Sequence, residues 1–280
     1  MKKVIIGILT FVLAFATLFT MTACDKIVKL EISLSVYNAD ASTSEEKTIT
    51  FDMYENLASD AANAVRDAVN GGAYDDCVFY VQSKDRGVTI SDQLMFGGLK
   101  KSGNSYVKVE QASVPGAEFL KNGIEGSNLK NVKGYLGLWR GWDSWKGYST
   151  SGFERSYATV FMPTVDSISS YDGNFCVFAK YSTEDDLAVI ESVIALLSNA
   201  DNYTEYTCYY SANADGTLKL DAQNEPIWNI VLTENFDEAE NVYDSAEDDG
   251  NADPVDTQYD SYTVKILNAN RLSITGIKIK

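Results

Sequence analysis

The chain has no histidine and only four cysteines in 280 residues, and these shortages exclude several kinds of chemistry. Without histidine, neither a Ser-His-Asp nor a Cys-His catalytic site can form, and the commonest zinc ligand is missing. No two of the cysteines form a Cys-x-x-Cys pair. We therefore expect no metal site and no cofactor.

Basic residues are also scarce. The chain carries 23 Lys and Arg against 40 Asp and Glu, which gives a formal net charge of −17. Nucleic acid and anionic lipid both attract proteins through basic surfaces, so this balance argues against either as a partner. We interpret the acidic surface as serving solubility outside the cell.

The N-terminus has the pattern of an export signal. Lys2 and Lys3 precede the apolar run Val4–Phe19, and Met21-Thr-Ala-Cys24 follows. An apolar core of this kind ahead of small residues indicates a signal peptide. The small-small-Cys ending resembles the lipobox of bacterial lipoproteins, in which Cys24 would become the lipidated first residue. The alternative is an ordinary signal peptide with a chance cysteine.

Lipidation at Cys24 predicts an extracytoplasmic lipoprotein of the bacterial cell membrane, held there by its anchor alone. Removal of residues 1–23 takes away two lysines and no acidic residue, so the formal charge of −17 becomes −19. After Cys24 an odd number of cysteines remains, Cys77, Cys176 and Cys208, which cannot all pair within the chain. We favour buried free thiols, and the alternative is one disulfide bond between two of these cysteines.

Hydrophobic periodicity predicts a mainly β protein. Glu31–Tyr37 and Thr48–Tyr54 alternate with period two and predict a hairpin. Ser59 is a candidate N-cap for a helix that ends at Gly71-Gly72, and Thr183 caps a second helix. The shorter strand candidates are 78–81, 93–96, 106–109, 135–138, 159–162 and 174–179. Many short strands with two helices favour a closed antiparallel barrel with helical caps.

The mature chain divides into a tether at 24–30, a barrel at 31–199, an insertion at 200–262 and closing strands at 263–280. Within the insertion, residues 234–260 hold eleven acidic residues and no Lys or Arg. Such a run is typical of a solvated loop, with weak calcium binding as the alternative. Asn213–Gly216 predicts a hairpin turn rather than a calcium loop, because the twelfth position from Ser211 is Ala222 and not Glu.

Three blocks of residues resemble cyclophilins, the peptidyl-prolyl cis-trans isomerases, in the order of that family. The first is Gly72–Phe79, which is similar to Gly-x-Tyr-Asp-Gly-x-x-Phe. The second runs from Val114 through Asn128-Leu-Lys130 to Gly134–Arg140, and the third is Tyr171–Lys180. The resemblance implies a closed antiparallel eight-stranded barrel capped by two α-helices, with a C-terminal insertion. It also implies a monomer that acts on proline-containing peptides or exported proteins.

The same resemblance places apolar residues where the family has its catalytic donors. The family's arginine position is Val81, its two glutamine positions are Phe96 and Thr159, and its aromatic or histidine position is Phe175. In this family the arginine is thought to donate to the proline nitrogen as the amide twists, which stabilises the transition state. Val81 cannot donate, so the resemblance implies a weak isomerase.

The resemblance also implies an apolar pocket for the proline ring. Its expected residues are Leu94, Phe96, Phe161, Tyr171, Phe175 and Trp139. Arg140 or Arg155 is a candidate substitute donor, since both lie near a segment that borders the family's peptide groove. Trp142 and Trp145 in this segment either pack over the barrel end or form an aromatic lip for extended peptides or sugars.

Three functions remain open at this point. The first is weak isomerisation of exported polypeptides. The second is a non-catalytic module that binds proline peptides or a surface partner on a cyclophilin scaffold. The third is a structural lipoprotein whose pocket is closed by Phe96 and Phe175.

Overall fold

The computed structural model describes residues 27–38, 42–85, 88–89, 93–109, 114–115, 129–140, 155–172, 175–222, 226–243 and 261–280. Cys24, Trp142 and Trp145 lie outside these residues. Within the described part of the chain, no helix is long and apolar enough to cross a membrane.

The fold begins with the predicted hairpin. β1 (Ile27–Asn38) and β2 (Thr43–Tyr54) pair antiparallel over their full length, with Leu30 opposite Phe51. Both side chains are buried, because every second residue of β1 from Val28 to Val36 and of β2 from Ile49 to Met53 is apolar and faces the core. β15 (Leu272–Ile279) pairs with the other edge of β1, and β1 begins at Ile27, inside the segment that we assigned to a tether.

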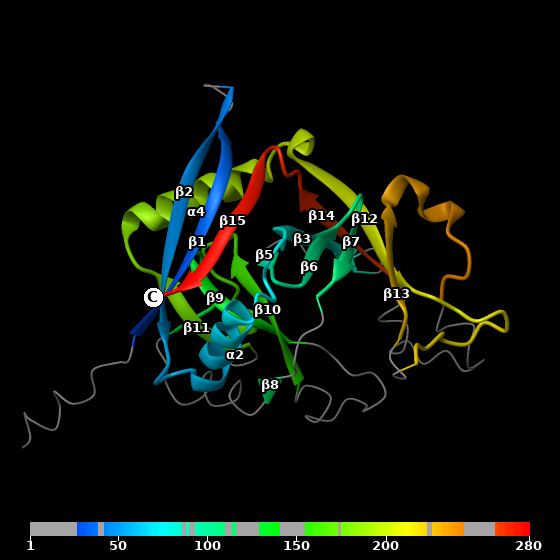
Figure 1. The fold of residues 1–280 in the computed structure, drawn as a ribbon, viewed down its shortest axis with the longest axis horizontal. Helices are drawn as coiled ribbons and strands as arrows, with labels where there is room; N and C mark the ends of the chain where they lie inside the picture. The colour runs from blue at the N-terminus through cyan, green and yellow to red at the C-terminus, as the bar shows by residue number, and fades with distance from the viewer. Residues whose placement is uncertain are drawn as a thin grey trace, which may run out of the picture.

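The hairpin belongs to one thirteen-stranded sheet, and β6 (Leu99–Ser102) and β7 (Ser105–Lys108) form a separate pair. The main path runs β13-β12-β14-β3-β5-β10-β9-β11-β2-β1-β15, with β4 beside β3 and β8 beside β10 (Figure 1). The remaining strands are β3 (Tyr80–Asp85), β4 (Val88–Thr89), β5 (Gln93–Phe96), β8 (Val114–Pro115), β9 (Tyr135–Arg140), β10 (Arg155–Pro163), β11 (Val177–Tyr181), β12 (Tyr203–Tyr210), β13 (Trp228–Leu232) and β14 (Ser261–Leu267).

The mainly β class is confirmed, but the closed eight-stranded barrel is wrong. The path of paired strands ends at β15 on one side and at β13 on the other, so the sheet stays open. Closure of the whole path would require its end strands β13 and β15 to pair, and they do not. β14, which precedes β15 in the chain, is not available to close the sheet either. A strand has only two edges, and β14 has filled both: β3 pairs with one and β12 with the other. The segment predicted as an insertion therefore supplies strands that extend the sheet.

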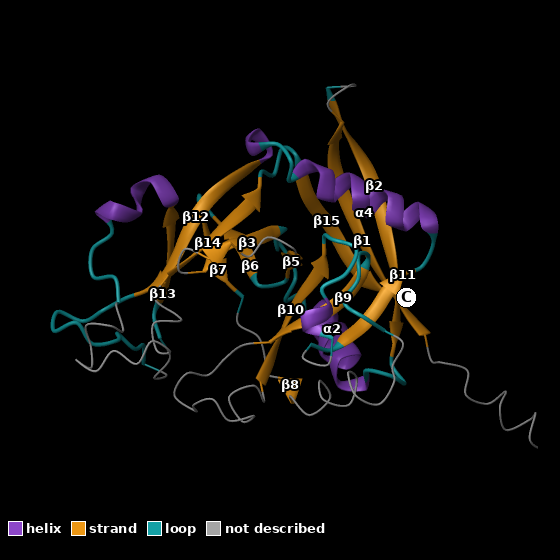
Figure 2. Cartoon of the chain, turned by 180° about the vertical axis from the view of Figure 1, so that it is seen from behind, coloured by secondary structure: helices purple, strands orange, loops and turns teal. Residues whose placement is uncertain are grey.

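Two helices cover the hydrophobic core that lies on one face of the sheet. α4 (Glu184–Leu196) crosses the strands β1, β2 and β15 (Figure 2). Its N-cap is Thr183, as predicted, and Thr183 and Asp186 form a reciprocal capping box. α2 (Ser59–Asn70) starts differently from the prediction, because Ser59 is the first helical residue and Ala58 is an N-cap without a side-chain bond.

The buried residues form two clusters on opposite faces of the sheet. The inner core is built from the inward residues of β1, β2, β5, β9, β10 and β11 together with the buried faces of α2 and α4. The outer core lies on the other face and contains Tyr80, Met95, Leu99, Phe161, Cys208, Val264 and Ile266, with partly buried aromatic residues around them.

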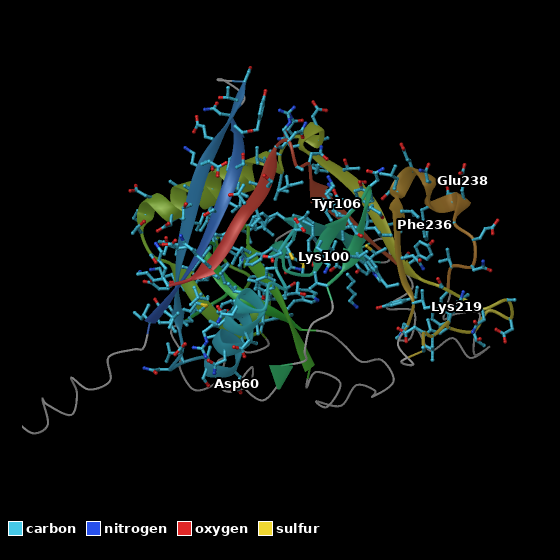
Figure 3. The ribbon with its side chains drawn as sticks, in the orientation of Figure 1. Asp60, Lys100, Tyr106, Lys219, Phe236 and Glu238 are labelled. Atoms are coloured by element: carbon cyan, nitrogen blue, oxygen red, sulfur yellow. The ribbon has the colours of Figure 1, made fainter. Side chains whose placement is uncertain are left out.

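The outer core is covered by the sheet extension, which we define as β12, β13 and β14. Its side chains Cys208, Val264 and Ile266 pack against Tyr80 and Met95 of the central strands. Tyr106 of β7 contacts Tyr206 of β12 edge to face, with ring centroids 5.1 Å apart. Figure 3 shows Tyr106 beside the extension, whose far side carries Phe236 of η5 (Thr233–Glu238). The extension is therefore part of the same packed unit as the central strands.

A turn at Asp76 supports the first block of the family resemblance. The family has glycine at this position, and Asp76 adopts a positive φ of 59°, the left-handed conformation that glycine favours. Its carbonyl accepts a hydrogen bond of 3.0 Å from Lys101 N of β6. The turn thus needs a backbone conformation that the aspartate tolerates only with strain.

We predict that Asp76→Gly raises the free energy of unfolding by about 0.5 kcal/mol, because relief of strain at positive φ exceeds the entropy cost of glycine. Urea unfolding measures the change. Asp75→Gly is the matched control, since Asp75 is a neighbouring exposed residue that is not at positive φ. The control is expected to be destabilised, and a loss of stability in both variants would contradict the prediction.

Candidate functional site

The pairing of β5 with β10 decides where the expected pocket residues lie. Phe96 is opposite Val160, and Met95 is opposite Phe161. Residues that face each other across an antiparallel pair lie on the same face, and the next residue along each strand lies on the other face. Phe96 and Phe161 are therefore on opposite faces of the sheet.

The expected six-residue pocket is accordingly not brought together. Leu94 and Phe96 belong to the inner core, and both are buried. They line an apolar cavity of about 10 Å³ between the sheet and α4. A space of that size holds about one water-sized sphere, so it cannot accept a proline ring.

The other four expected residues do meet, on the outer face, and we call them the aromatic cluster. Trp139 of β9 lies with its ring centroid 6.2 Å from that of Phe161 and 5.5 Å from that of Phe175. Tyr171 lies 5.8 Å from Phe161 and 4.4 Å from Phe175. Phe161 is buried beneath the group, whereas Trp139, Tyr171 and Phe175 are each partly exposed. The cluster can therefore present aromatic faces to a ligand.

Gly137 makes room for the ring at the base of the cluster. It is paired with Phe161 on the neighbouring strand, and a Cβ at Gly137 would lie 2.5 Å from two ring atoms of Phe161. The far end of the phenyl ring therefore occupies the space that a side chain at this position of β9 would fill. The absence of a side chain at Gly137 thus lets the Phe161 ring pack close to β9, below the partly exposed rings of the cluster.

We predict that Gly137→Ala lowers the free energy of unfolding by about 1–3 kcal/mol, because the added methyl group overlaps the Phe161 ring. Thermal unfolding measures the loss. Gly276→Ala is the control, since its Cβ would meet nothing closer than 4.0 Å. Equal stability of the two variants would show that the ring moves aside at no cost.

The positions that the resemblance aligns with the family's catalytic residues lie on both faces of the sheet. Val81 is 4% exposed and faces the inner core, so the apolar residue at the arginine position is also on the wrong face. Tyr80, its neighbour, faces the outer core. A Cβ at Gly98 would lie 2.3 Å from the Tyr80 hydroxyl oxygen and 3.1 Å from Thr159 Oγ1, so both hydroxyls lie beside the Gly98 backbone.

The sheet extension encloses this part of the outer face. Trp228 Nε1 donates a hydrogen bond of 3.2 Å to the Tyr262 hydroxyl. Burial raises the pKa of the Tyr80 and Tyr262 hydroxyls and of the Cys208 thiol, so all three stay neutral at physiological pH. The three cysteines of the described residues are buried, and burial raises the pKa of the Cys77 thiol to about 12. The hydroxyls of Tyr80 and Tyr262 and the thiols of Cys77 and Cys208, with their raised pKa, are therefore not activated nucleophiles.

The two candidate substitute arginines are placed only by their backbones. Arg140 pairs with Ser156, the residue after Arg155, so both lie at the same end of the β9–β10 ladder. Trp139 immediately precedes Arg140 on β9. Their side chains lie outside the described part of the structure. Among the described residues, no group of three or more Cys, Asp or Glu side chains could hold a metal ion.

Comparison with known proteins gives matches only among solved structures. No family model matches the chain, and no curated protein matches it. The chain is similar to a cyclophilin-type peptidyl-prolyl cis-trans isomerase of Cryptosporidium parvum. For the crystal structure with the dipeptide Ala-Pro, the TM-score is 0.37 at 12% identity, covering 73% of this chain and 94% of that one. For the structure of that protein reported without mention of the dipeptide, the TM-score is 0.36 at 12% identity, covering 74% and 94%.

The structure adds one residue that sequence reasoning missed. Gln93 is 1% exposed, and neither its amide nitrogen nor its amide oxygen has a hydrogen-bond partner. It lies two residues before Met95 on β5, so strand alternation places it on the outer face. Its sequence context, a strand candidate with period two, gives no signal that its amide would be buried.

We predict that Gln93→Leu raises the free energy of unfolding by about 1 kcal/mol, because it removes two buried polar atoms that lack partners. Gln82→Leu is the control, since Gln82 is only partly buried and its amide is not among the unpartnered groups. Chemical denaturation compares the two. A loss of stability in Gln93→Leu would show that a buried water satisfies the amide.

Proposed function

We propose that this chain is a proline-peptide-binding protein on a cyclophilin-like scaffold, anchored outside the bacterial cytoplasm by a lipid on Cys24. Its ligands are proline-containing segments of exported proteins. The observation that carries the proposal is the aromatic cluster, in which Trp139, Tyr171 and Phe175 surround the buried ring of Phe161 and remain partly exposed.

The chemistry of the cluster suits a proline ring. Proline-rich segments dock on aromatic-lined surfaces, because the pyrrolidine ring is apolar and its backbone is already restricted. The three partly exposed rings offer apolar faces, and the formal charge of −17 gives no preference for acidic ligands. Binding through such rings needs neither a metal nor a nucleophile.

Isomerisation requires more than binding. The barrier to rotation about the peptide bond is about 18–20 kcal/mol, and a positioned donor lowers it by stabilising the twisted amide. Val81 stands at the family's donor position and faces the inner core. Loss of one positioned donor costs about 10²–10³ in rate, so we propose that any isomerisation is slower than in a complete family site by about that factor.

Weak isomerase activity is the second candidate function. It is favoured by the location of Arg140, which follows Trp139 of the aromatic cluster directly, and by the pairing of β9 and β10 that brings Arg155 to the same end of the ladder. An arginine at this end could donate to a peptide held by the cluster. Isomerisation that falls in Arg140→Ala or Arg155→Ala would support this candidate.

We expect the purified protein to bind the tetrapeptide Ala-Ala-Pro-Phe and not Ala-Ala-Ala-Phe. Phe175→Ala should lower the affinity at least about tenfold, because one of the three exposed rings is lost. Phe236→Ala is the matched control: this aromatic residue contacts Tyr209 on the far side of the extension, and its loss should leave the affinity unchanged.

Peptide titration followed by NMR measures binding, and exchange NMR of the cis and trans prolyl signals on the same samples measures isomerisation. Equal affinity for the proline and alanine peptides would refute the proposed function. Proline binding together with isomerisation at the rate of a complete family site would instead show that the protein is a catalyst, and it would refute a function limited to binding.

A further inference from the structure

The turn that carries Tyr171 and Phe175 is joined to Asn131, a residue shortly before β9, chiefly through the carboxylate of Asp172. Asp172 Oδ1 accepts a hydrogen bond of 2.9 Å from the backbone nitrogen of Asn131 and another of 3.0 Å from Asn131 Nδ2. In return, the carbonyl oxygen of Asn131 accepts a 2.8 Å bond from Ile168 N. Three hydrogen bonds thus join the turn to the residue that lies four positions before β9.

The turn has little structure of its own. It consists of η3 (Ser169–Tyr171) and the bonds Tyr171 N to Ile168 O, Asp172 N to Ser169 O and Phe175 N to Tyr171 O, at 2.9, 3.2 and 3.1 Å. A single 3₁₀ turn is only marginally stable in isolation. Its N-terminal part, with Tyr171 and Asp172, is held to the sheet by the bonds to Asn131 and by ring packing, whereas the residue after Phe175, Cys176, accepts a 3.0 Å bond from Leu138 N of β9.

The buried position of Asn131 carries an energetic penalty. Its side chain is 1% exposed, and its Oδ1 has no hydrogen-bond partner. A buried acceptor without a partner is unfavourable, and an apolar side chain of similar size would avoid that penalty. The side-chain bond that Asn131 does make goes to Asp172, and a hydrogen bond to an ionised carboxylate is among the stronger kinds.

We propose that Asn131 and Asp172 are positioning residues of the aromatic cluster. Through their bonds they hold the rings of Tyr171 and Phe175, whose centroids are 4.4 Å apart, against Phe161 in the arrangement that grips a proline ring. Neither residue touches the peptide. This inference rests on the proposed function, because it assigns the pair a role in the same binding site.

The test compares variants that break the tie with one that preserves it. Asp172→Ala removes the acceptor and should weaken binding of Ala-Ala-Pro-Phe at least about tenfold, because the two rings lose their fixed position. Asp172→Asn should remain within about threefold of the natural protein, since its amide oxygen still accepts. Asn131→Ala removes only the side-chain bond, so its affinity should fall between those two.

Asp166→Ala is the matched control. Asp166 lies on the same connection between β10 and the turn and pairs with Lys133 at 3.0 Å, but its side chain is almost fully exposed. The ion pair holds neither Tyr171 nor Phe175. Peptide affinity should therefore be unchanged, which separates a general effect of charge removal on this connection from the specific tie at Asp172.

A second measurement needs no ligand. Amide hydrogen exchange of Tyr171, Asp172 and Phe175, followed by NMR in the absence of peptide, should accelerate in Asp172→Ala and stay near the natural rate in Asp172→Asn. If Asp172→Ala does not fold, Asn131→Ala answers both questions, since it keeps the backbone bond to Asp172.

The outcomes separate the two proposals. Faster exchange together with weaker binding supports the positioning role. Faster exchange with unchanged affinity overturns it, and so does unchanged exchange in both Asp172→Ala and Asn131→Ala. If the natural protein binds no proline peptide, the proposed function fails and the positioning role fails with it. In that case the exchange rates still show whether Asn131 and Asp172 hold the turn.

Discussion

The alternation of side chains across β10 is the constraint on which the rest of the molecule depends. Val160 and Met162 face the inner core, and Phe161 between them faces the outer core. If the pairing of β10 with β5 shifted by one residue, Val160 and Met162 would face the outer core and Phe161 the inner core, and neither core would pack as it does now. Both hydrophobic clusters, and the aromatic cluster at the edge of the outer one, are therefore set by the same ladder of backbone hydrogen bonds.

This alternation also explains the limits of prediction from sequence. The hairpin of β1 and β2, the capping box at Thr183 and the glycine stop after α2 could be predicted because each rests on local chemistry. The prediction of Ser59 as N-cap is wrong by one position, because the N-cap is Ala58, which has no side-chain oxygen to accept a bond. Asp76 is a further local feature: it has the positive φ expected at the turn position where the motif has glycine.

The candidate site was predictable in composition but not in arrangement. The motifs name six apolar residues, and the structure gathers Trp139, Phe161, Tyr171 and Phe175 while sending Leu94 and Phe96 to the opposite face. Sequence motifs carry no information about the face on which a strand residue lies when both faces of the sheet are buried. In a sheet that is buried on both faces, burial does not alternate along a strand, as in β5, where all four residues are buried although Gln93 is polar.

The pairings of β1 with β15 and of β3 with β14 limit the order in which the sheet can form during synthesis. β1 can acquire its second neighbour only when β15, near the end of the described chain, has been synthesised, and β3 likewise waits for β14. Such long-range pairings carry a high loop-closure entropy and slow the search for the native state. Until β15 is available, the N-terminal hairpin has one unpaired edge, which makes this interval the one most exposed to association with other chains.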